Sequence, residues 1–283
     1  MSMDAFSPSE AYVPLPSLFD REAWEHLLHV LEQKQAMLVL PQANAVLMDM
    51  LEMLQVHTRE VFSIEWASTH AALGVVYTEL GYGTEERSTM LELALEHYQQ
   101  ALQVLTEETF PGYWAIIQQG LCATYLLKRD GDIAANLQQS IVRGQAALRV
   151  LTRSAYPFEW AGAHAHLSEA YRRAALHAGL QDLYSGRSVM QEQALRHLEA
   201  ALQVYTMRDY PLEWAKVQRF QCMIYFDRVQ GKRDENLERS RQCLEAVLQV
   251  FSYEFSPLAG SESRTWRDFS VFWQSLSKFS AGH

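Results

Sequence analysis

Cysteine is scarce in this chain and forms no recognisable pattern. The three cysteines, Cys122, Cys222 and Cys243, are an odd number without CxxC spacing, so the sequence indicates neither a disulfide framework nor a zinc site. This usage is typical of a reducing compartment, and we expect a cytoplasmic protein. No apolar run approaches the length of a membrane-spanning helix, and the polar N-terminus, which contains several prolines, is unlike a signal peptide.

Basic charge is also in short supply. Lys and Arg number 24 against 34 Asp and Glu, a net charge of −10, which disfavours an electrostatic hold on a phosphate backbone and hence a nucleic-acid partner. The sequence has no glycine-rich phosphate loop and no motif that sets a nucleophile beside a base. We therefore expect a protein without cofactors that is not an enzyme of a familiar mechanism.

Histidine spacing gives little support for a metal site. His164 and His166 are two residues apart and would point to different sides of a helix, whereas His26 and His29 are one turn apart but lack a third ligand. We expect no metal.

What the chain does have is a repeated frame of Thr, Trp and Tyr. The frame recurs at an interval of about fifty residues, and a repeat of this size with helical periodicity favours an α-solenoid. The four copies keep the same internal spacing: Thr58…Trp66…Tyr77, Thr106…Trp114…Tyr125, Thr152…Trp160…Tyr171 and Thr206…Trp214…Tyr225.

Each copy is expected to form two helices. Three copies have an aromatic-proline pair before the Trp, and proline suits the first turn of a new helix. Glycine six residues after the Tyr predicts where three first helices stop (Gly83, Gly131 and Gly231), whereas the third copy predicts a longer loop, through Ser185 and Gly186. The second helices are expected to begin near Ser88, Ile133, Ser188 and Asp234, with a small-x3-large-x2-small pattern to which Gly144 is an exception.

The chain ends lie outside this frame. Residues 1–17 contain Pro8, Pro14 and Pro16 and are expected to form an extended arm. Residues 18–252 are expected to form the helical array, which opens with a helix from Leu18 and a second from Asn44 to His57. In residues 253–283 the frame breaks, and an amphipathic helix over residues 262–279 is expected to cap the array.

The order small-x2-Leu-small-x2-Tyr followed by Ala-x3-aromatic-x2-Ala resembles the tetratricopeptide repeat (TPR). Leu73-Gly74-Tyr77 with Ala94-Tyr98-Ala101 carries it most fully. The helices are longer than in a standard TPR, and with the [FY]-P-x-x-W-A entry and Asn-Leu-x-x-[ST] at Asn136 and Asn236 the repeats are similar to those beside CHAT-type caspase-like proteases and other bacterial signalling modules. The resemblance covers roughly residues 42–252, and we expect the protease part to be absent.

This resemblance implies an all-α, right-handed α-solenoid of tandem TPR-like hairpins with a C-terminal capping helix. Such arrays serve protein–protein interaction as scaffolds or adaptors, with a concave groove lined by first-helix residues at fixed offsets from the Tyr. Carrying those offsets over gives the groove candidates Glu79, Gln119, Glu169, Arg172, Arg173, Lys216, Arg219 and Asp227.

Two sets of polar residues admit two interpretations each. Arg172, Arg173, Lys216 and Arg219 form either a basic patch that clamps a carboxylate of a peptide or a solvated face bridged to Glu169 and Asp227. The family's tryptophan position holds a polar residue in every copy, which we interpret as a ladder of hydrogen bonds between successive repeats, with ligand binding as the alternative. The ladder residues are His70, Gln118, His164 and Gln218.

The sequence therefore favours a non-catalytic scaffold that binds a protein or peptide segment in its groove and regulates a separately encoded effector. The alternative is an enzyme or small-molecule-binding protein whose helical shell encloses an aromatic cavity. A third hypothesis is self-association through the C-terminal aromatic residues, so the oligomeric state stays open. Those residues are Trp266, Phe269, Phe272 and Trp273.

Overall fold

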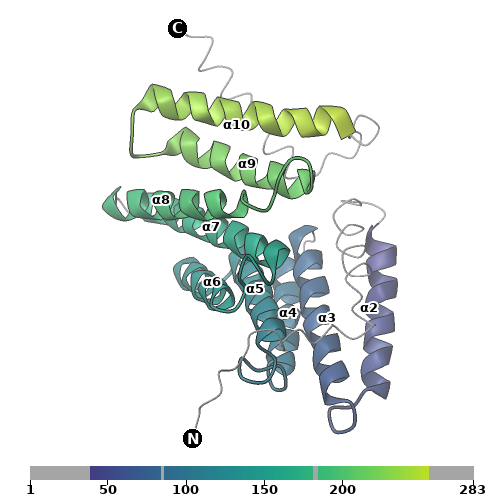
Figure 1. The fold of residues 1–283 in the computed structure, drawn as a ribbon. Helices are drawn as coiled ribbons and strands as arrows, with labels where there is room; N and C mark the ends of the chain where they lie inside the picture. Colours follow the sequence, from purple (N-terminus) through teal and green to yellow (C-terminus); the bar gives the residue numbers. More distant parts are fainter. Residues whose placement is uncertain (1–38, 84–85, 181–183, 255–283) are drawn as a thin grey trace, which may run out of the picture. The chain divides into compact units, whose positions relative to one another are not determined.

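The described part of the chain is entirely helical. The structure is a computed structural model that describes residues 39–83, 86–180 and 184–254, and within these ranges it contains helices and connecting turns but no strand (Figure 1). The all-α prediction is confirmed. The expected arm over residues 1–17, the helix from Leu18 and the capping helix over residues 262–279 lie outside the described residues.

After α2 (Val39–Val56), the helices follow one another as hairpins. Pro41 falls in the first turn of α2, which begins at Val39 rather than at Asn44 as expected. The members of each hairpin contact each other, and every first helix also contacts the first helix of the next hairpin. The hairpins are α3 (Ser63–Gly83) with α4 (Arg87–Ala101), α5 (Pro111–Leu127) with α6 (Ile133–Leu148), α7 (Pro157–Leu180) with α8 (Tyr184–Ala201), and α9 (Pro211–Asp227) with α10 (Arg233–Glu254).

Proline and its preceding aromatic residue set the start of the first helices, as expected. Pro111 and Pro211 are the first residues of α5 and α9, where a missing N–H costs no hydrogen bond. Phe110 and Tyr210 before them have φ of −138° and −141°, the extended backbone that a following proline favours. Each of these aromatic residues also donates its backbone N–H to the carbonyl of the Thr four residues earlier.

Two predictions about the helix ends are wrong. Helices α5 and α9 end at Leu127 and Asp227, before the glycines expected to stop them. Gly131 and Gly231 instead have φ of 69° and 84° within the connecting turns, a left-handed conformation that other residues adopt at a cost. In the third hairpin the extra residues lengthen α7 to 24 residues rather than lengthening the loop, because His177 and its neighbours continue the helix.

Tyr98 shows how the second helices pack. Its ring is buried between α3 and α5, where a Cβ atom added at Gly74 would lie 2.6 Å from the ring and one added at Gly120 would meet the Tyr98 hydroxyl oxygen. The two glycines therefore provide the space that Tyr98 fills. In the next hairpin, Gly144 admits Leu167, whose Cγ lies 2.6 Å from the glycine's Cβ position, so the exception in the pattern is a close contact between helices.

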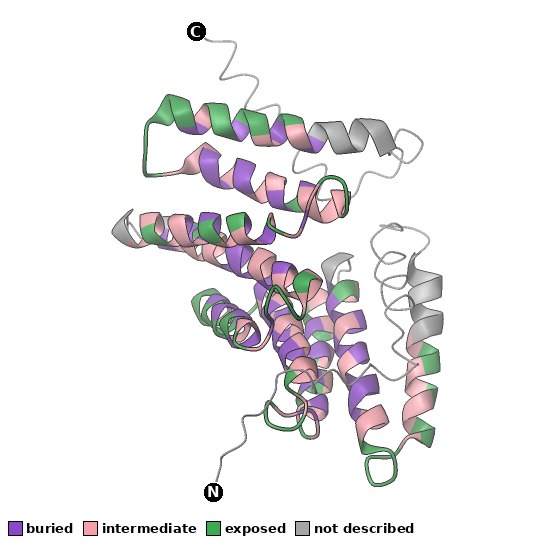
Figure 2. Ribbon diagram, in the orientation of Figure 1, coloured by how far each residue is buried: buried purple, intermediate pink, exposed green. Residues whose placement is uncertain are grey.

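The buried residues follow the inner faces of the hairpins, and the turns between hairpins are exposed (Figure 2). One buried cluster is centred on Leu73, Tyr98 and Leu105 of the first hairpin and extends to Ile117 of α5. A second cluster is centred on Leu198 and continues to Ile224 of α9. Each cluster thus spans two hairpins, so burial joins neighbouring hairpins as well as the helices within each.

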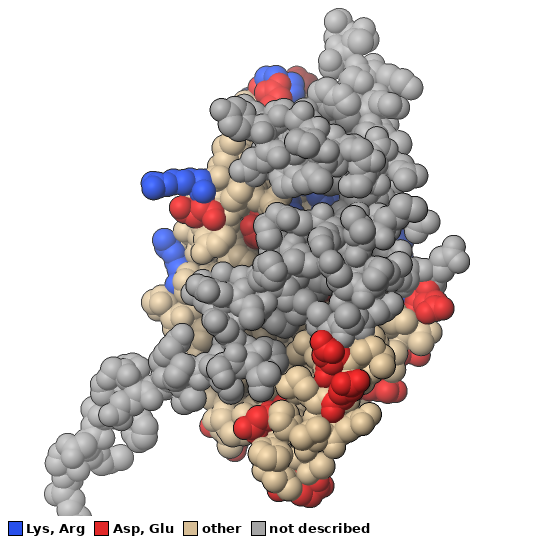
Figure 3. All heavy atoms as spheres, turned by 90° about the vertical axis from the view of Figure 1, so that its right-hand side faces the viewer, with Lys and Arg blue, Asp and Glu red and all other residues tan. Residues whose placement is uncertain are grey.

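Acidic side chains gather at the corner where α2 meets α3. The charged side chains visible in the lower part of Figure 3 are Asp and Glu, whereas Lys and Arg are visible higher in that view. The segment from α2 to the start of α3 contributes Asp49, Glu52, Glu60 and Glu65, with Arg59 as its basic residue.

Candidate functional site

The first helices α3, α5, α7 and α9 form a continuous row, because each contacts the next. The groove candidates lie on this row but differ in exposure. Lys216 and Glu79 are exposed, Gln119 and Arg219 are half-buried, and Glu169 is buried.

Glu169 of α7 is the centre of a compact ionic cluster. Its carboxylate accepts hydrogen bonds from Arg172 (2.6 and 2.8 Å) and from Nε of Arg173 (2.8 Å). Burial alone would raise the pKa of the Glu169 carboxyl, but the two guanidinium groups outweigh it and lower that pKa to about 2. Arg173 also donates to the carbonyl of Leu126 at the end of α5, so the cluster ties α7 to the preceding hairpin.

Lys216 and Arg219 belong to α9, which contacts α7. Burial, and then the positive charge of Lys216, lower the pKa of His166 on α7 to about 4, so His166 is neutral near pH 7. The guanidinium of Arg219 lies 4.8 Å from the ring centroid of Phe220. The structure thus brings Lys216 toward a histidine of α7.

The remaining groove candidates lie apart from one another. Asp227 accepts hydrogen bonds from Arg187 (2.7 Å) and Gln191 (3.2 Å), so it joins α9 to α8. The amide of Gln119 faces Gly162 on α7, whose Cβ position lies 2.6 Å from its Nε2 atom. Glu79 lies on the exposed side of α3.

Three of the four predicted ladder residues, His70, Gln118 and His164, bond within their own hairpins. His70 on α3 pairs with His97 on α4, and His164 on α7 pairs with His197 on α8; the Nδ1 atoms lie 2.8 Å apart in both pairs. Gln118 likewise accepts from Arg143 of α6 at 3.2 Å. We expected these bonds to link successive repeats, but these three side chains face the second helix of their own hairpin.

The two histidine pairs have nearly the same surroundings. The Trp66 and Trp160 rings lie 4.4 Å from His70 and His164, and the Tyr77 and Tyr171 rings stack on His97 and His197 at 5.3 and 5.5 Å. One imidazole of each pair donates its Nδ1–H and the other accepts, so each pair needs a neutral acceptor. Burial, and then the charge of its partner, lower the pKa of His70 and of His164 to about 4, which keeps both neutral near pH 7.

Sequence reasoning missed the partners on the second helices. His97 and His197 directly precede the large residue of the small-large-small pattern, in the two copies whose first helix carries His. In the second copy Gln118 pairs with Arg143. In the fourth copy Cys243 occupies the position that corresponds to Arg143. The residue at the first-helix position and the residue at the second-helix position therefore change together from copy to copy. This pattern was visible in the sequence and indicates that the two side chains are in contact.

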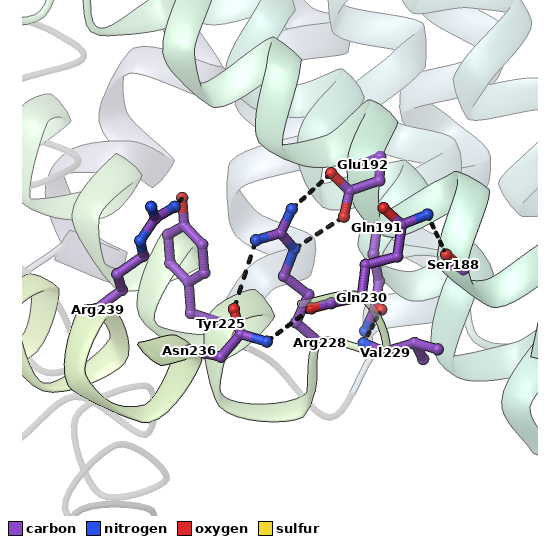
Figure 4. Close-up of polar contacts among 9 residues, drawn as sticks. All are labelled: Ser188, Gln191, Glu192, Tyr225, Arg228, Val229, Gln230, Asn236 and Arg239. Atoms are coloured by element: carbon purple, nitrogen blue, oxygen red, sulfur yellow. Dashed lines mark hydrogen bonds and ion pairs between the residues drawn. The ribbon is translucent and has the colours of Figure 1, made fainter. Parts of the chain in front are cut away.

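A polar network holds the fourth hairpin to the third (Figure 4). Arg228 forms two hydrogen bonds of 2.8 Å with the carboxylate of Glu192 on α8. Buried Gln191 accepts from the backbone N–H of Val229 at 2.9 Å and donates to the Asp227 carbonyl at 3.1 Å. The network therefore satisfies the backbone just where α9 ends.

The Asn-Leu-x-x-Ser stretches stabilise the turn inside two hairpins. Asn136 and Asn236 each donate to the carbonyl six residues earlier, at Asp130 and Gln230. Ser140 and Ser240 donate to the carbonyls of Cys122 and Cys222 at 2.8 and 2.9 Å. These motif residues therefore have a structural use.

The thiols of Cys122, Cys222 and Cys243 favour their protonated form. Burial raises the pKa of the Cys122 and Cys243 thiols to about 12 and also raises that of Cys222, which disfavours the nucleophilic thiolate. Within residues 39–83, 86–180 and 184–254, no three His, Cys, Asp or Glu side chains gather as metal ligands. None of the helices in the same ranges is long and apolar enough to span a membrane.

Comparison of the chain with models of protein families, with curated proteins and with solved structures finds no match in any of the three. The resemblance to the TPR and to the repeats of bacterial signalling proteins stays a prediction.

Proposed function

We propose that this protein is a non-catalytic, TPR-like scaffold that binds a peptide or protein segment along its row of first helices. In this proposal the hairpins stack as an α-solenoid, the row α3–α5–α7–α9 forms its concave wall, and residues 262–279 supply the capping helix. The observation that carries the proposal is the continuity of the row, in which each first helix contacts the next. A continuous helical wall offers an extended segment contacts with several hairpins at once.

The use of the polar side chains supports a scaffold over an enzyme. The histidine pairs and the Ser–Cys bonds connect the two helices of one hairpin, and Arg173 of the Glu169 cluster connects α7 to α5 of the preceding hairpin. A binding wall requires fixed register both within and between hairpins, since this keeps its side chains at constant spacing. The three unpaired thiols agree with a reducing compartment such as the cytoplasm.

The α7–α9 part of the row is the proposed contact for the partner. Arg172, Arg173, Lys216 and Arg219 bring four cationic groups to this part of the row, and two of them, Arg172 and Arg173, bind Glu169. Cationic groups of this kind suit a carboxylate of the bound segment, which guanidinium groups hold with paired hydrogen bonds. We propose that the bound protein is an effector encoded separately.

The experiment is capture of partners from the native lysate by the intact protein, with mass spectrometry of bound proteins and small molecules. Because Arg172 and Arg173 hold buried Glu169, the test variant is Lys216→Glu with Arg219→Glu, which leaves that cluster in place. Arg196→Glu with Arg208→Glu, at exposed positions of α8 and the following turn, is the control of equal charge.

A protein retained by wild type and by the control but lost by the Lys216/Arg219 variant is the expected result. Retention by all three chains would remove the α7–α9 surface as the contact. A retained small molecule without any protein would overturn the scaffold proposal in favour of a ligand-binding protein.

A further inference from the structure

Large apolar side chains are exposed at the corner where α2 meets α3. Met48 and Val56 on α2 are 56% and 70% exposed, and Val61 and Phe62 in the following turn are 70% and 42% exposed. Met48, Glu52 and Val56 follow one another at intervals of four residues, so they form one stripe along α2. Val61 and Phe62 follow in the turn after α2, where the Phe62 N–H bonds to the carbonyl of Thr58.

Carboxylates lie on this stripe and near it in the sequence, and they have no cationic partner among the described residues. Asp49 and Glu52 lie on α2, Glu60 lies in the turn, and Glu65 lies in the first turn of α3. The basic residue of this corner, Arg59, points elsewhere: it donates to Gln103 at 2.6 Å, and its guanidinium lies 5.7 Å from the Trp66 ring. Within the described residues none of these four carboxylates forms an ion pair with Arg59 or another cation, and the charged side chains visible in the lower part of Figure 3 are Asp and Glu.

Carboxylates elsewhere in the described chain are paired in many places. Glu107 bonds to Arg149, Glu169 to two arginines, and Glu192 to Arg228. The α2–α3 corner differs because it combines unpaired negative charge with exposed apolar surface. Such a combination is complementary to a helix with one apolar stripe and Lys or Arg on either side of it.

We propose that the α2–α3 corner is a docking surface for a basic amphipathic helix of a partner protein. The apolar stripe of that helix would cover Met48, Val56 and Val61, and its basic residues would meet Glu52 and Glu60. Met48 and Val56 are eight residues apart, which at the rise of an α-helix is about 12 Å, or roughly two turns of the partner helix. This surface is separate from the α7–α9 contact and stands without it.

The test uses the full-length protein and two synthetic helical peptides of the same length. One peptide has Leu at helical spacing with Lys on the other face, and the second has Glu in place of every Lys. Binding is followed by fluorescence anisotropy at about 50 mM salt, where exposed charges are weakly screened. We expect the Leu/Lys peptide to bind and the Leu/Glu peptide not to bind.

A matched pair of variants separates this surface from the general attraction of an acidic protein for a cation. Glu52→Lys with Glu60→Lys should weaken binding of the Leu/Lys peptide about tenfold or more, since it removes both charges that face the helix. Glu199→Lys with Asp234→Lys changes the net charge equally at exposed positions of α8 and α10 and should change affinity less than about twofold. Val56→Ser should weaken binding without any change of charge.

Equal losses in the two double variants would overturn the proposal, because binding would then follow net charge alone. Equal binding of the two peptides would overturn it too. If sedimentation of the protein alone shows a dimer that Glu52→Lys with Glu60→Lys dissociates, the corner holds a second copy of the chain and the proposed partner is wrong.

Discussion

His70 and His97 face each other across the α3–α4 hairpin with their Nδ1 atoms 2.8 Å apart. The same relationship recurs between His164 and His197, with the same ring neighbours. A pair of this kind tolerates one added proton but not two, because the second removes the hydrogen-bond acceptor. The two hairpins therefore share a dependence on neutral histidine.

Stability should fall as the pH falls from about 6.5 to about 4. Burial lowers the pKa of His70 and His164 to about 4 in the folded chain from 6.5, so in this window the unfolded chain binds more protons and is favoured. The loss should be on the order of a few kcal/mol. Urea unfolding at several pH values, followed by circular dichroism, measures it.

The second hairpin provides the control for this prediction. It pairs Gln118 with Arg143 at the same two positions, so His70→Gln with His97→Arg, made together with His164→Gln and His197→Arg, keeps a polar pair without titration. The free energy of unfolding of this variant should depend less on pH. Some dependence should remain because of His166, whose pKa is also about 4. An unchanged slope would show that the histidine pairs do not cause the acid sensitivity.

Gly74→Ala should destabilise the chain although alanine favours helices. The new methyl group would lie 2.6 Å from the buried Tyr98 ring, and overpacking of this kind costs about 1–3 kcal/mol. Tyr98→Leu should rescue Gly74→Ala, because the third hairpin already has Leu198 at the matching position. A double-mutant cycle from urea unfolding checks the coupling, and purely additive effects would contradict the packing argument.

The helices and their faces could be predicted from the sequence because their signals are local. Pro111 and Pro211 fix helix starts through their own geometry, and the Trp-to-Tyr stripe follows from helical periodicity. The end of α7 could not be predicted, because Gly179 in a helix is tolerated when neighbouring residues propagate it.

The chemistry of the candidate site was harder to predict than the helices. The offsets from the Tyr correctly identified which residues lie on the first helices, but they carry no information about partners. Glu169 is buried with Arg172 and Arg173, and Asp227 bonds to Gln191. Both contacts depend on which side chains of neighbouring turns or hairpins come close enough to bond. The position of Gln191 in the sequence, where the first hairpin has Leu91, was the available sign of a buried polar contact.

Glu169→Gln should destabilise the folded chain strongly. Removing the carboxylate leaves Arg172 and Arg173 partly buried without their shared anion, a change that costs about 3–5 kcal/mol. Glu199→Gln, at an exposed position of α8, should change stability by less than about 0.5 kcal/mol. Thermal and urea unfolding at pH 7 compare the two, and similar small effects would mean that the ionic cluster adds little to stability.

Gln191→Leu should loosen the joint between the third and fourth hairpins. The substitution removes the acceptor of the Val229 N–H and the donors to Asp227, and unsatisfied buried groups cost about 1–3 kcal/mol each. In the first two hairpins Leu91 corresponds to Gln191 and Leu127 corresponds to Asp227. The double variant Gln191→Leu with Asp227→Leu therefore replaces the polar pair with the apolar pair found there. Hydrogen exchange at Val229 and in α9 should rise in the single variant and recover partly in the double variant, since Arg187 would still lack its carboxylate. If exchange in α9 is unchanged by Gln191→Leu, apolar burial around Leu198 and Ile224 holds the two hairpins together without the polar network.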